Sequence, residues 1–226
     1  MDTMQKEEIE QLLVDNQHLK EYLESIRHKM GNPVFFSKVP HEAGNESYPN
    51  FIYPTKGVVF IHIYRTQDMD ELEYHVIEPT INDVLREKLD MVLKLIVKKA
   101  PEKKSVLTDD EMREVIKELI DEIALIDEKA GTQGIPKKRG NARQEKVKVT
   151  SFQKNVLQYN IIKTLVGGGP LEAFMRDPYL EDIHFVANEK IHLIHKVFGM
   201  IKTNIIVGEK ESPEFTRAFS EKMGAP

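Results

Sequence analysis

The chain contains no cysteine among its 226 residues, which excludes several kinds of chemistry. Without thiols it forms no disulfide bond, no thiolate metal site and no cysteine-linked intermediate. Long apolar runs are also missing, because segments such as GVVFIHIY are much shorter than the roughly 20 residues that cross a membrane. The N-terminus, MDTMQKEEIEQ, is polar and acidic and does not resemble a signal peptide. These absences fit a protein of the reducing cytoplasm.

Charged residues make up 31% of the chain and hydrophobic residues 40%, with a net charge of −5. This balance is typical of a folded, helix-rich protein whose surface mixes both signs of charge. The length suits one large domain or two small ones. We predict an α+β fold, with a helical N-terminal part and a β-hairpin. A second small α+β domain of PAS-like type would follow, containing an antiparallel meander and incomplete at its C-terminus.

Residues 1–30 are predicted to form a helix that carries heptads. Its apolar positions recur at spacings of three and four, with an asparagine at an a position: Ile9, Leu12, Asn16, Leu19, Leu23, Ile26 and Met30. Two interpretations remain open, a coiled coil with a partner helix and packing against the chain's own domain. Gly31 and Pro33 end the helix.

Residues 31–130 are expected to form an N-terminal α+β domain. Segment 31–56 is rich in Pro, Gly and Asn and predicts an irregular connection. A hairpin over 57–78 follows, because two β-branched and aromatic runs flank the polar loop TQDMD. His62 and His75 would lie near one another across it, but two histidines are too few ligands for a metal site.

Two amphipathic helices, over 80–99 and 108–130, complete this domain. The second begins with a capping box in which Glu111 reaches back to the Thr108 amide. Residues 131–149 then bring Gly, Pro and many basic residues together, which predicts an interdomain linker. No aromatic residue interleaves with these cations, so nucleic-acid binding is not expected.

Residues 150–226 are predicted to form the second, truncated domain. It would begin with a helix over 151–166, followed by three glycines and the short helix PLEAFM. The runs IHFVA, KIHLIHK and GMIKTNIIV predict three antiparallel strands. A last helix would begin at Ser212, with an apolar stripe of Phe215, Phe219 and Met223.

Sequence motifs for catalysis are missing. The run GGGP is not followed by Lys-Ser or Lys-Thr, so it is not a phosphate-binding loop. No Ser-His-Asp order, zinc spacing or dinucleotide fingerprint stands out. We therefore predict no catalytic, cofactor-binding or metal-ligating residue in this chain, and no enzymatic activity of the chain alone.

The segment LEAFMRDPYLEDIHF, with IHLIHKVFGMIKTNI after it, resembles the N-terminal region of the ATPases that drive type II secretion, type IV pili and archaeal flagella. The family's motif has the form D-P-L-M-x-D-P-x-I-E-D-I, followed by strands with H-x-x-y-G and T-N-I. An upstream run, LEYHVIEPTI, is similar to a strand-to-helix junction of the archaeal branch. The matching positions are Tyr74, Glu78, Pro79, Leu171, Met175, Asp177, Pro178, Glu181, Asp182, Ile183, His195, Gly199, Thr203, Asn204 and Ile205.

This resemblance implies a hexameric ATPase that powers protein secretion or the assembly of a pilus or archaeal flagellum. ATP and Mg²⁺ would bind the parent protein's motor domain, whose P-loop is expected beyond Pro226. The N-terminal domains would serve ring assembly, docking to a membrane-embedded platform protein, and nucleotide-gated movement, at the cytoplasmic face of the membrane. One departure is Gly169, which stands where the family usually has aspartate.

The segment MRDPYLEDI is interpreted mainly as a structural joint between a helix and a sheet. Asp177 would accept backbone N–H bonds within the turn, and Glu181 and Asp182 would bond amides or a basic partner. A contact between subunits is the main alternative. The residues that carry this joint or interface are predicted to be Glu78, Pro79, Asp177, Pro178, Glu181, Asp182, Ile183, Gly199, Thr203 and Asn204. Alternative functions are a stand-alone PAS-like sensory or binding module and a coiled-coil scaffold.

Overall fold

The structure is a computed structural model that describes residues 3–55, 57–102, 108–131, 146–167 and 169–210, together with 212, 213, 216, 217 and 220. The chain divides into two compact units. The first combines Met1–Pro79 with Gly168–Pro226, and the second is Thr80–Gly167. Across the described residues, no helix has the length and apolar character needed to cross a membrane.

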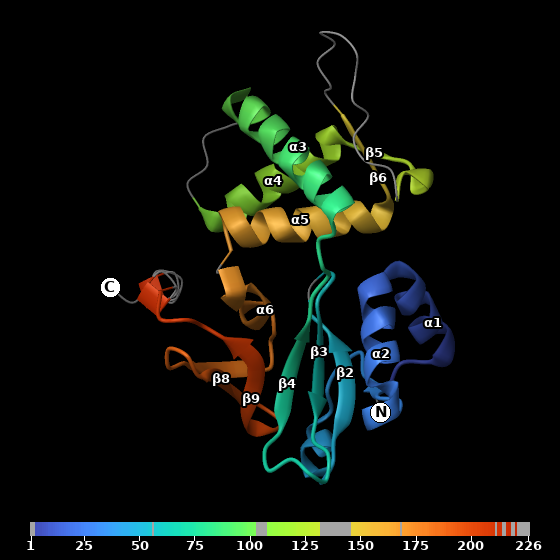
Figure 1. Cartoon of the computed structure of the whole chain (residues 1–226), viewed down its shortest axis with the longest axis vertical. Coiled ribbons are helices and arrows are strands. Elements are labelled where there is room, and N and C mark those ends of the chain that lie inside the picture. The colour runs from blue at the N-terminus through green and yellow to red at the C-terminus, as the bar shows by residue number, and fades with distance from the viewer. Residues whose placement is uncertain are drawn as a thin grey trace. The chain divides into compact units, whose positions relative to one another are not determined.

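A seven-stranded sheet forms the centre of the first unit, in the order β1-β2-β3-β4-β9-β8-β7 (Figure 1). Neighbouring strands are antiparallel except in the β1–β2 and β4–β9 pairs, which are parallel. The α+β prediction is thus confirmed, as are the hairpin and the meander. The strands are β1 (Val34–Phe35), β2 (Asn50–Pro54), β3 (Phe60–Tyr64), β4 (Glu73–Ile77), β7 (Leu180–His184), β8 (Lys190–His195) and β9 (Gly199–Ile206).

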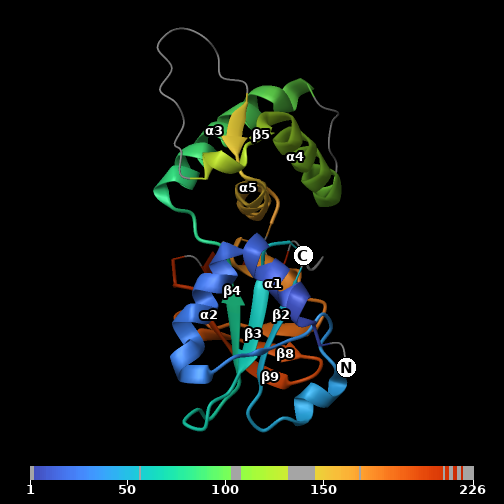
Figure 2. The ribbon, with the colours of Figure 1, turned by 90° about the vertical axis from the view of Figure 1, so that its right-hand side faces the viewer.

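The predicted heptad helix is two helices, α1 (Lys6–Asp15) and α2 (Gln17–Met30). They separate at Asn16, whose backbone leaves the helical region (φ −133°, ψ 78°) and whose Nδ2 donates to the Leu12 carbonyl at 3.0 Å. Figure 2 shows both helices in front of β2, β3 and β4. Their apolar seam packs on this sheet, where Leu19 is fully buried. Packing on the chain's own domain is therefore confirmed, and the coiled-coil interpretation of this seam is wrong.

The segment predicted to be an irregular connection, 31–56, contains β1, β2 and the short 3₁₀-helix η1 (His41–Asn45). This prediction was wrong because abundant Pro, Gly and Asn surround a short run of strand residues. The run is NFIYP, in which Phe51, Ile52 and Tyr53 are all buried. Strand β2 pairs with β3 over its whole length, so the sheet extends past the predicted hairpin.

The second unit packs three helices, α3 (Asp83–Lys99), α4 (Asp109–Ile123) and α5 (Ser151–Leu165), around one apolar core. The capping box at Thr108 is present as predicted. Helix α4 ends sooner than expected, because the chain continues as β5 (Ala124–Ile126), which pairs in parallel with β6 (Val147–Val149). Short 3₁₀-helices follow α3 (η2, Ala100–Glu102) and β5 (η3, Glu128–Ala130).

One lysine is buried inside this second unit. Lys88 is 1% exposed, and its Nζ donates to the Ala130 carbonyl at 2.7 Å and to Gln153 Oε1 at 2.8 Å. Burial lowers the pKa of Lys88 because the apolar surroundings disfavour its charged form. Two good acceptors satisfy the ammonium, so its role here is to tie α3 to η3 and α5.

The two units do not follow the predicted domain boundaries of 31–130 and 150–226. The helices after the hairpin and α5 form the second unit, whereas the hairpin shares its sheet with the C-terminal meander. The reason is the parallel pairing of β4 with β9, a long-range contact that local periodicity does not reveal.

Of the predicted linker 131–149, residues 132–145 lie outside the described residues, as do Phe215, Phe219 and Met223 of the predicted last helix.

Candidate functional site

Asp177 occupies the turn between the short helix α6 (Glu172–Met175), which follows the 3₁₀-helix η4 (Gly169–Leu171), and strand β7. Pro178 disfavours a helical conformation at the preceding residue, so the chain turns here. The Asp177 Oδ1 accepts the Tyr179 amide at 2.8 Å, as the sequence predicted for an aspartate in this position. Asp177 as a whole is only 5% exposed. The turn is therefore built around a buried acid.

Two tyrosines from the other part of the first unit converge on this carboxylate. The hydroxyls of Tyr53, in β2, and Tyr74, in β4, each donate to Asp177 Oδ2 at 2.7 Å. Both tyrosines are almost completely buried. Asp177 thus joins the N-terminal strands to the α6–β7 turn, more than 100 positions later in the chain.

His195, at the end of β8, extends this network. Its Nδ1 accepts the Val197 amide at 3.1 Å, so the ring proton of the neutral imidazole resides on Nε2. That Nε2 lies 3.3 Å from the Tyr53 hydroxyl oxygen, to which it donates, while the Tyr53 proton points to Asp177. The Tyr179 ring stacks on His195 with a centroid distance of 5.5 Å. His195 therefore reaches the Asp177 carboxylate only through the Tyr53 hydroxyl.

Burial decides the electrostatics of these groups. It raises the pKa of Asp177 above its usual range, although the three hydrogen bonds to the carboxylate act in the opposite direction. Burial also lowers the pKa of His195 to about 4, helped by the nearby Lys196 charge. The pKa values of Tyr53 and Tyr74 rise well above 10 for the same reason. The histidine and both tyrosines are therefore neutral at physiological pH.

The network is better suited to holding strands together than to acid–base catalysis. Both Asp177 oxygens already accept hydrogen bonds within the protein, and the carboxylate is shielded from solvent. A general acid or base must instead lie within hydrogen-bond reach of a substrate. We define this set, Asp177, Tyr53, Tyr74, Tyr179 and His195, as the carboxylate joint.

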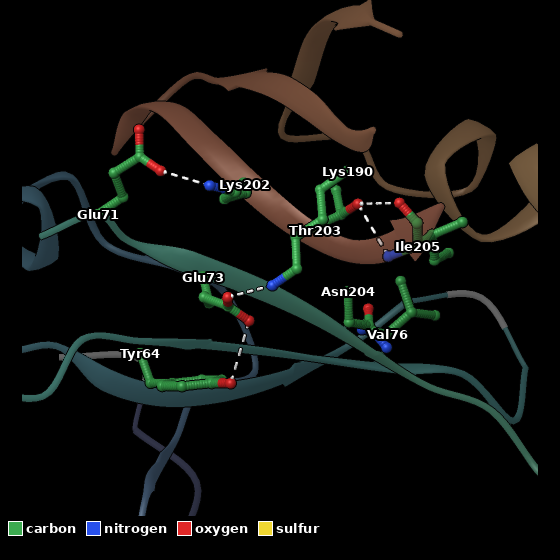
Figure 3. Close-up of polar contacts among 9 residues, drawn as sticks. All are labelled: Tyr64, Glu71, Glu73, Val76, Lys190, Lys202, Thr203, Asn204 and Ile205. Atoms are coloured by element: carbon green, nitrogen blue, oxygen red, sulfur yellow. Dashed lines mark hydrogen bonds and ion pairs between the residues drawn. The ribbon is translucent and has the colours of Figure 1, made fainter. Parts of the chain in front are cut away.

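Thr203 and Asn204 lie where the two parts of the sheet meet, between β4 and β9. Thr203 is buried and pairs with Tyr74 in the parallel register. The Asn204 Oδ1 accepts the Val76 amide at 3.1 Å, which continues the β4–β9 contact by a side chain (Figure 3). The Thr203 hydroxyl bonds the backbone of Ile205. These two predicted residues therefore contribute to the same junction as Asp177.

Ion pairs cross the same junction on the sheet surface. Lys190 contacts Glu73 at 2.6 Å, and Lys202 contacts Glu71 at 3.0 Å (Figure 3). The Glu73 carboxylate also accepts the Tyr64 hydroxyl at 3.3 Å. Both pairs are partly exposed to solvent and contribute on the order of 1 kcal/mol or less each, so they adjust the pairing of β4 with β9 rather than determine it.

The remaining predicted residues lie around the joint without entering it. Glu181 and Asp182 are exposed, and Asp182 accepts the Ile183 amide and pairs with His184 at 3.2 Å. Ile183 is half-buried, so β7 returns only partly to the core.

The other predicted residues mark turns and ends of strands. Pro178 is exposed, and its carbonyl accepts Lys196 Nζ at 2.6 Å. Gly199 begins β9 with φ +70°, a conformation that favours glycine. Glu78 and the buried Pro79 follow β4, and Pro79 is the last residue of the N-terminal segment of the first unit. The structure thus brings Asp177, Thr203 and Asn204 to one junction and leaves the others at its margins.

A second hydrogen-bond network, centred on the buried His62, lies between α2 and the sheet. Asn50 Nδ2 donates to the Met30 carbonyl at 2.7 Å, so Asn50 Oδ1 accepts from His62 Nε2, also at 2.7 Å. His62 Nδ1 then accepts the Tyr22 hydroxyl at 2.7 Å. Burial, with a smaller contribution from His75, lowers the pKa of His62 to about 3.

His62 and His75 lie directly opposite each other on β3 and β4, as predicted. Both nitrogens of His62 are engaged within the protein, which leaves no lone pair for a metal ion. In the described part of the chain, no group of three or more His, Asp or Glu side chains is arranged to hold a metal. The pair is therefore part of the α2–sheet packing.

Comparison with curated proteins finds similarity to an uncharacterized protein of Methanocaldococcus jannaschii. The two are 34% identical over 227 aligned positions, which cover 99% of this chain and 41% of that relative. The chain therefore spans less than half the length of the relative that it matches. No family model matches the chain.

Sequence reasoning missed Tyr53, because it did not recognise the strand that carries it. The available signal was the run of three apolar residues in NFIYP, of which the middle one faces α2 and the outer ones face the opposite side. Tyr74 and His195 were noted as matching positions, but their contact with the aspartate could not be read from their spacing. The carboxylate joint depends on pairing between distant strands.

Proposed function

We propose that this chain is the N-terminal region of an ATPase of the type that drives protein secretion or the assembly of pili and archaeal flagella. The observation that carries the proposal is that the two segments which resemble this family, LEYHVIEPTI and the region from LEAFMRDPYLEDIHF onward, meet in one sheet. Tyr74, from the upstream segment, bonds Asp177 of the downstream segment and lies beside Thr203. Residues 103 positions apart in the chain thus serve one junction.

The length of the relative gives further support. Most of that archaeal protein lies outside the part that this chain matches, which leaves ample room for a motor domain. In this proposal ATP and Mg²⁺ bind that domain, and the parent protein is a hexamer. The chain contributes ring assembly, docking to a membrane-embedded platform protein, and movements coupled to nucleotide binding at the cytoplasmic face of the membrane.

The alternative of a coiled-coil scaffold is weakened by the packing of α1 and α2. Their heptad seam already contacts Phe35, Ile52, Phe60 and Ile77 within the chain's own sheet. A stand-alone binding module remains the second candidate, and it is favoured by the hollow at the edge of β1 described below.

A measurement of ATP hydrolysis tests the proposal. The purified 226-residue chain is expected to show no turnover above background, whereas the same chain extended through its gene's next domain should hydrolyse ATP and form hexamers. Reading the gene past codon 226 should reveal an in-frame G-x-x-x-x-G-K-[ST] motif. Turnover by the isolated chain, or a continuation without that motif, would contradict the proposal.

A further inference from the structure

A hollow of about 650 Å³ opens beside β1, at the edge of the sheet in the first unit. Strands β1 and β2 supply one wall, and η1 with the residues around it supplies another. This volume falls within the range of about 300–1,000 Å³ that is usual for ligand pockets. None of the residues of the carboxylate joint lines it, so it is a separate site.

Aromatic rings form the apolar part of this hollow. Phe36 and Phe51 are 6% and 8% exposed, with ring centroids 5.0 Å apart. Val34, Pro40 and Ala43 complete the apolar lining. Phe36 is held in place by its backbone, because its amide donates to the Ile52 carbonyl at 2.9 Å. The strand-edge backbone beneath this wall is therefore tied to β2.

Two glutamates also line the hollow, Glu42 in η1 and Glu46 immediately after it. Across the part of the chain that the structure describes, neither carboxylate has an ion-pair or hydrogen-bond partner. The lining includes no Lys, Arg or His. An apolar hollow with aromatic walls thus carries two uncompensated negative charges.

We propose that this hollow binds a basic segment of a partner protein through an arginine or lysine side chain. The aliphatic part of that side chain packs against Phe36 and Phe51, and its cation lies near Glu42 and Glu46. A neutral apolar segment leaves both carboxylates uncompensated, and a nucleic acid is repelled by them. Room for more than one side chain favours a peptide over a small cation. The inference does not depend on the ATPase assignment.

Calorimetric titration of the 226-residue chain tests this inference. The probe is an acetylated and amidated hexapeptide of alternating leucine and arginine, with a matched peptide in which citrulline replaces each arginine. Binding of the arginine peptide is expected with a Kd on the order of 100 µM. The citrulline peptide keeps the shape but loses the charge, so its affinity should be lower by about tenfold. Raising the salt concentration should weaken only the arginine peptide.

Variants locate the binding site on the protein. The double change Glu42→Gln and Glu46→Gln should weaken arginine-peptide binding by about tenfold, since each rim charge contributes a few-fold. Val34→Arg places a cation of the chain itself in the hollow and should also weaken binding. As a matched control, Glu24→Gln with Glu87→Gln removes the same charge from exposed sites elsewhere and should change the affinity by less than about twofold.

Three results would overturn the proposal. One is the absence of binding by the arginine peptide at millimolar concentration. Another is equal weakening by the control pair, which would indicate nonspecific attraction to an acidic protein. The third is binding of methylguanidinium as tightly as the peptide, which would identify a small cation as the ligand.

Discussion

Replacing Asp177 by alanine is expected to lower the free energy of unfolding of the first unit by about 3–5 kcal/mol. The change removes the acceptor of two buried tyrosine hydroxyls and one backbone amide. Each buried donor left without a partner costs about 1–3 kcal/mol, and the deleted side chain leaves a void. The loss is partly offset because burial of the carboxylate is itself unfavourable, as its raised pKa indicates. Urea denaturation followed by NMR signals of β3 and β8 measures the effect.

Asp182→Ala is the matched control, because it removes an aspartate of the same segment that is exposed. Its local contacts are to the Ile183 amide and to His184, so the expected change is within about 0.5 kcal/mol. Asp177→Asn keeps one acceptor oxygen and should lose less than Asp177→Ala. Equal losses from Asp177→Ala and Asp182→Ala would show that the carboxylate joint does not hold the unit together.

Lowering the pH from 7 to 5 is expected to destabilise the first unit by several kcal/mol. His62 and His195 have folded pKa values of about 3 and about 4, below the ordinary value of 6.5. Their contribution to stability is therefore fully present above pH 6.5 and is lost as the pH falls from 6.5 toward those folded values. Over this window each contributes a loss of about 2 kcal/mol. The raised pKa of Asp177 acts in the opposite sense at lower pH, since the folded state takes up that proton more readily.

His62→Gln tests the assignment of this acid sensitivity. Glutamine can still donate to Asn50 and accept from Tyr22 but does not titrate, so the pH dependence of the unfolding free energy should fall by about 2 kcal/mol over the same window. His28→Gln, at an exposed position of α2, makes the same substitution outside the His62 network and serves as the control. An unaltered slope in His62→Gln would contradict a buried neutral histidine.

The local elements could be predicted from the sequence because their signals are local. Apolar spacing predicted α3 and α4, and the Thr108 cap appears where expected. Runs of β-branched and aromatic residues around a polar loop predicted the hairpin, and three short runs after residue 182 predicted the meander. Strand β2 was missed because turn-forming residues surround it, and the single N-terminal helix was wrong because Asn16 interrupts it.

The arrangement of the units could not be predicted for a different reason. The helical second unit is inserted between β4 and the C-terminal meander, yet Glu73 pairs with Lys202 across that insertion. Such a pairing leaves no trace in the periodicity of either segment. The candidate site shows the same division: the turn role of Asp177 was predicted from Pro178, whereas its tyrosine partners come from the distant strands β2 and β4.

Native-state hydrogen exchange tests most directly whether the two distant segments form one folded unit. Amides of β3, from the N-terminal segment, and of β8, from the C-terminal segment, are expected to exchange with one common free energy of opening, because they belong to one sheet. The amides of α5 should exchange with a different free energy of opening, which they share with the amides of α3 and α4. If instead β8 and β9 open together with α5, at a free energy different from that of β3, the division into these two units is wrong.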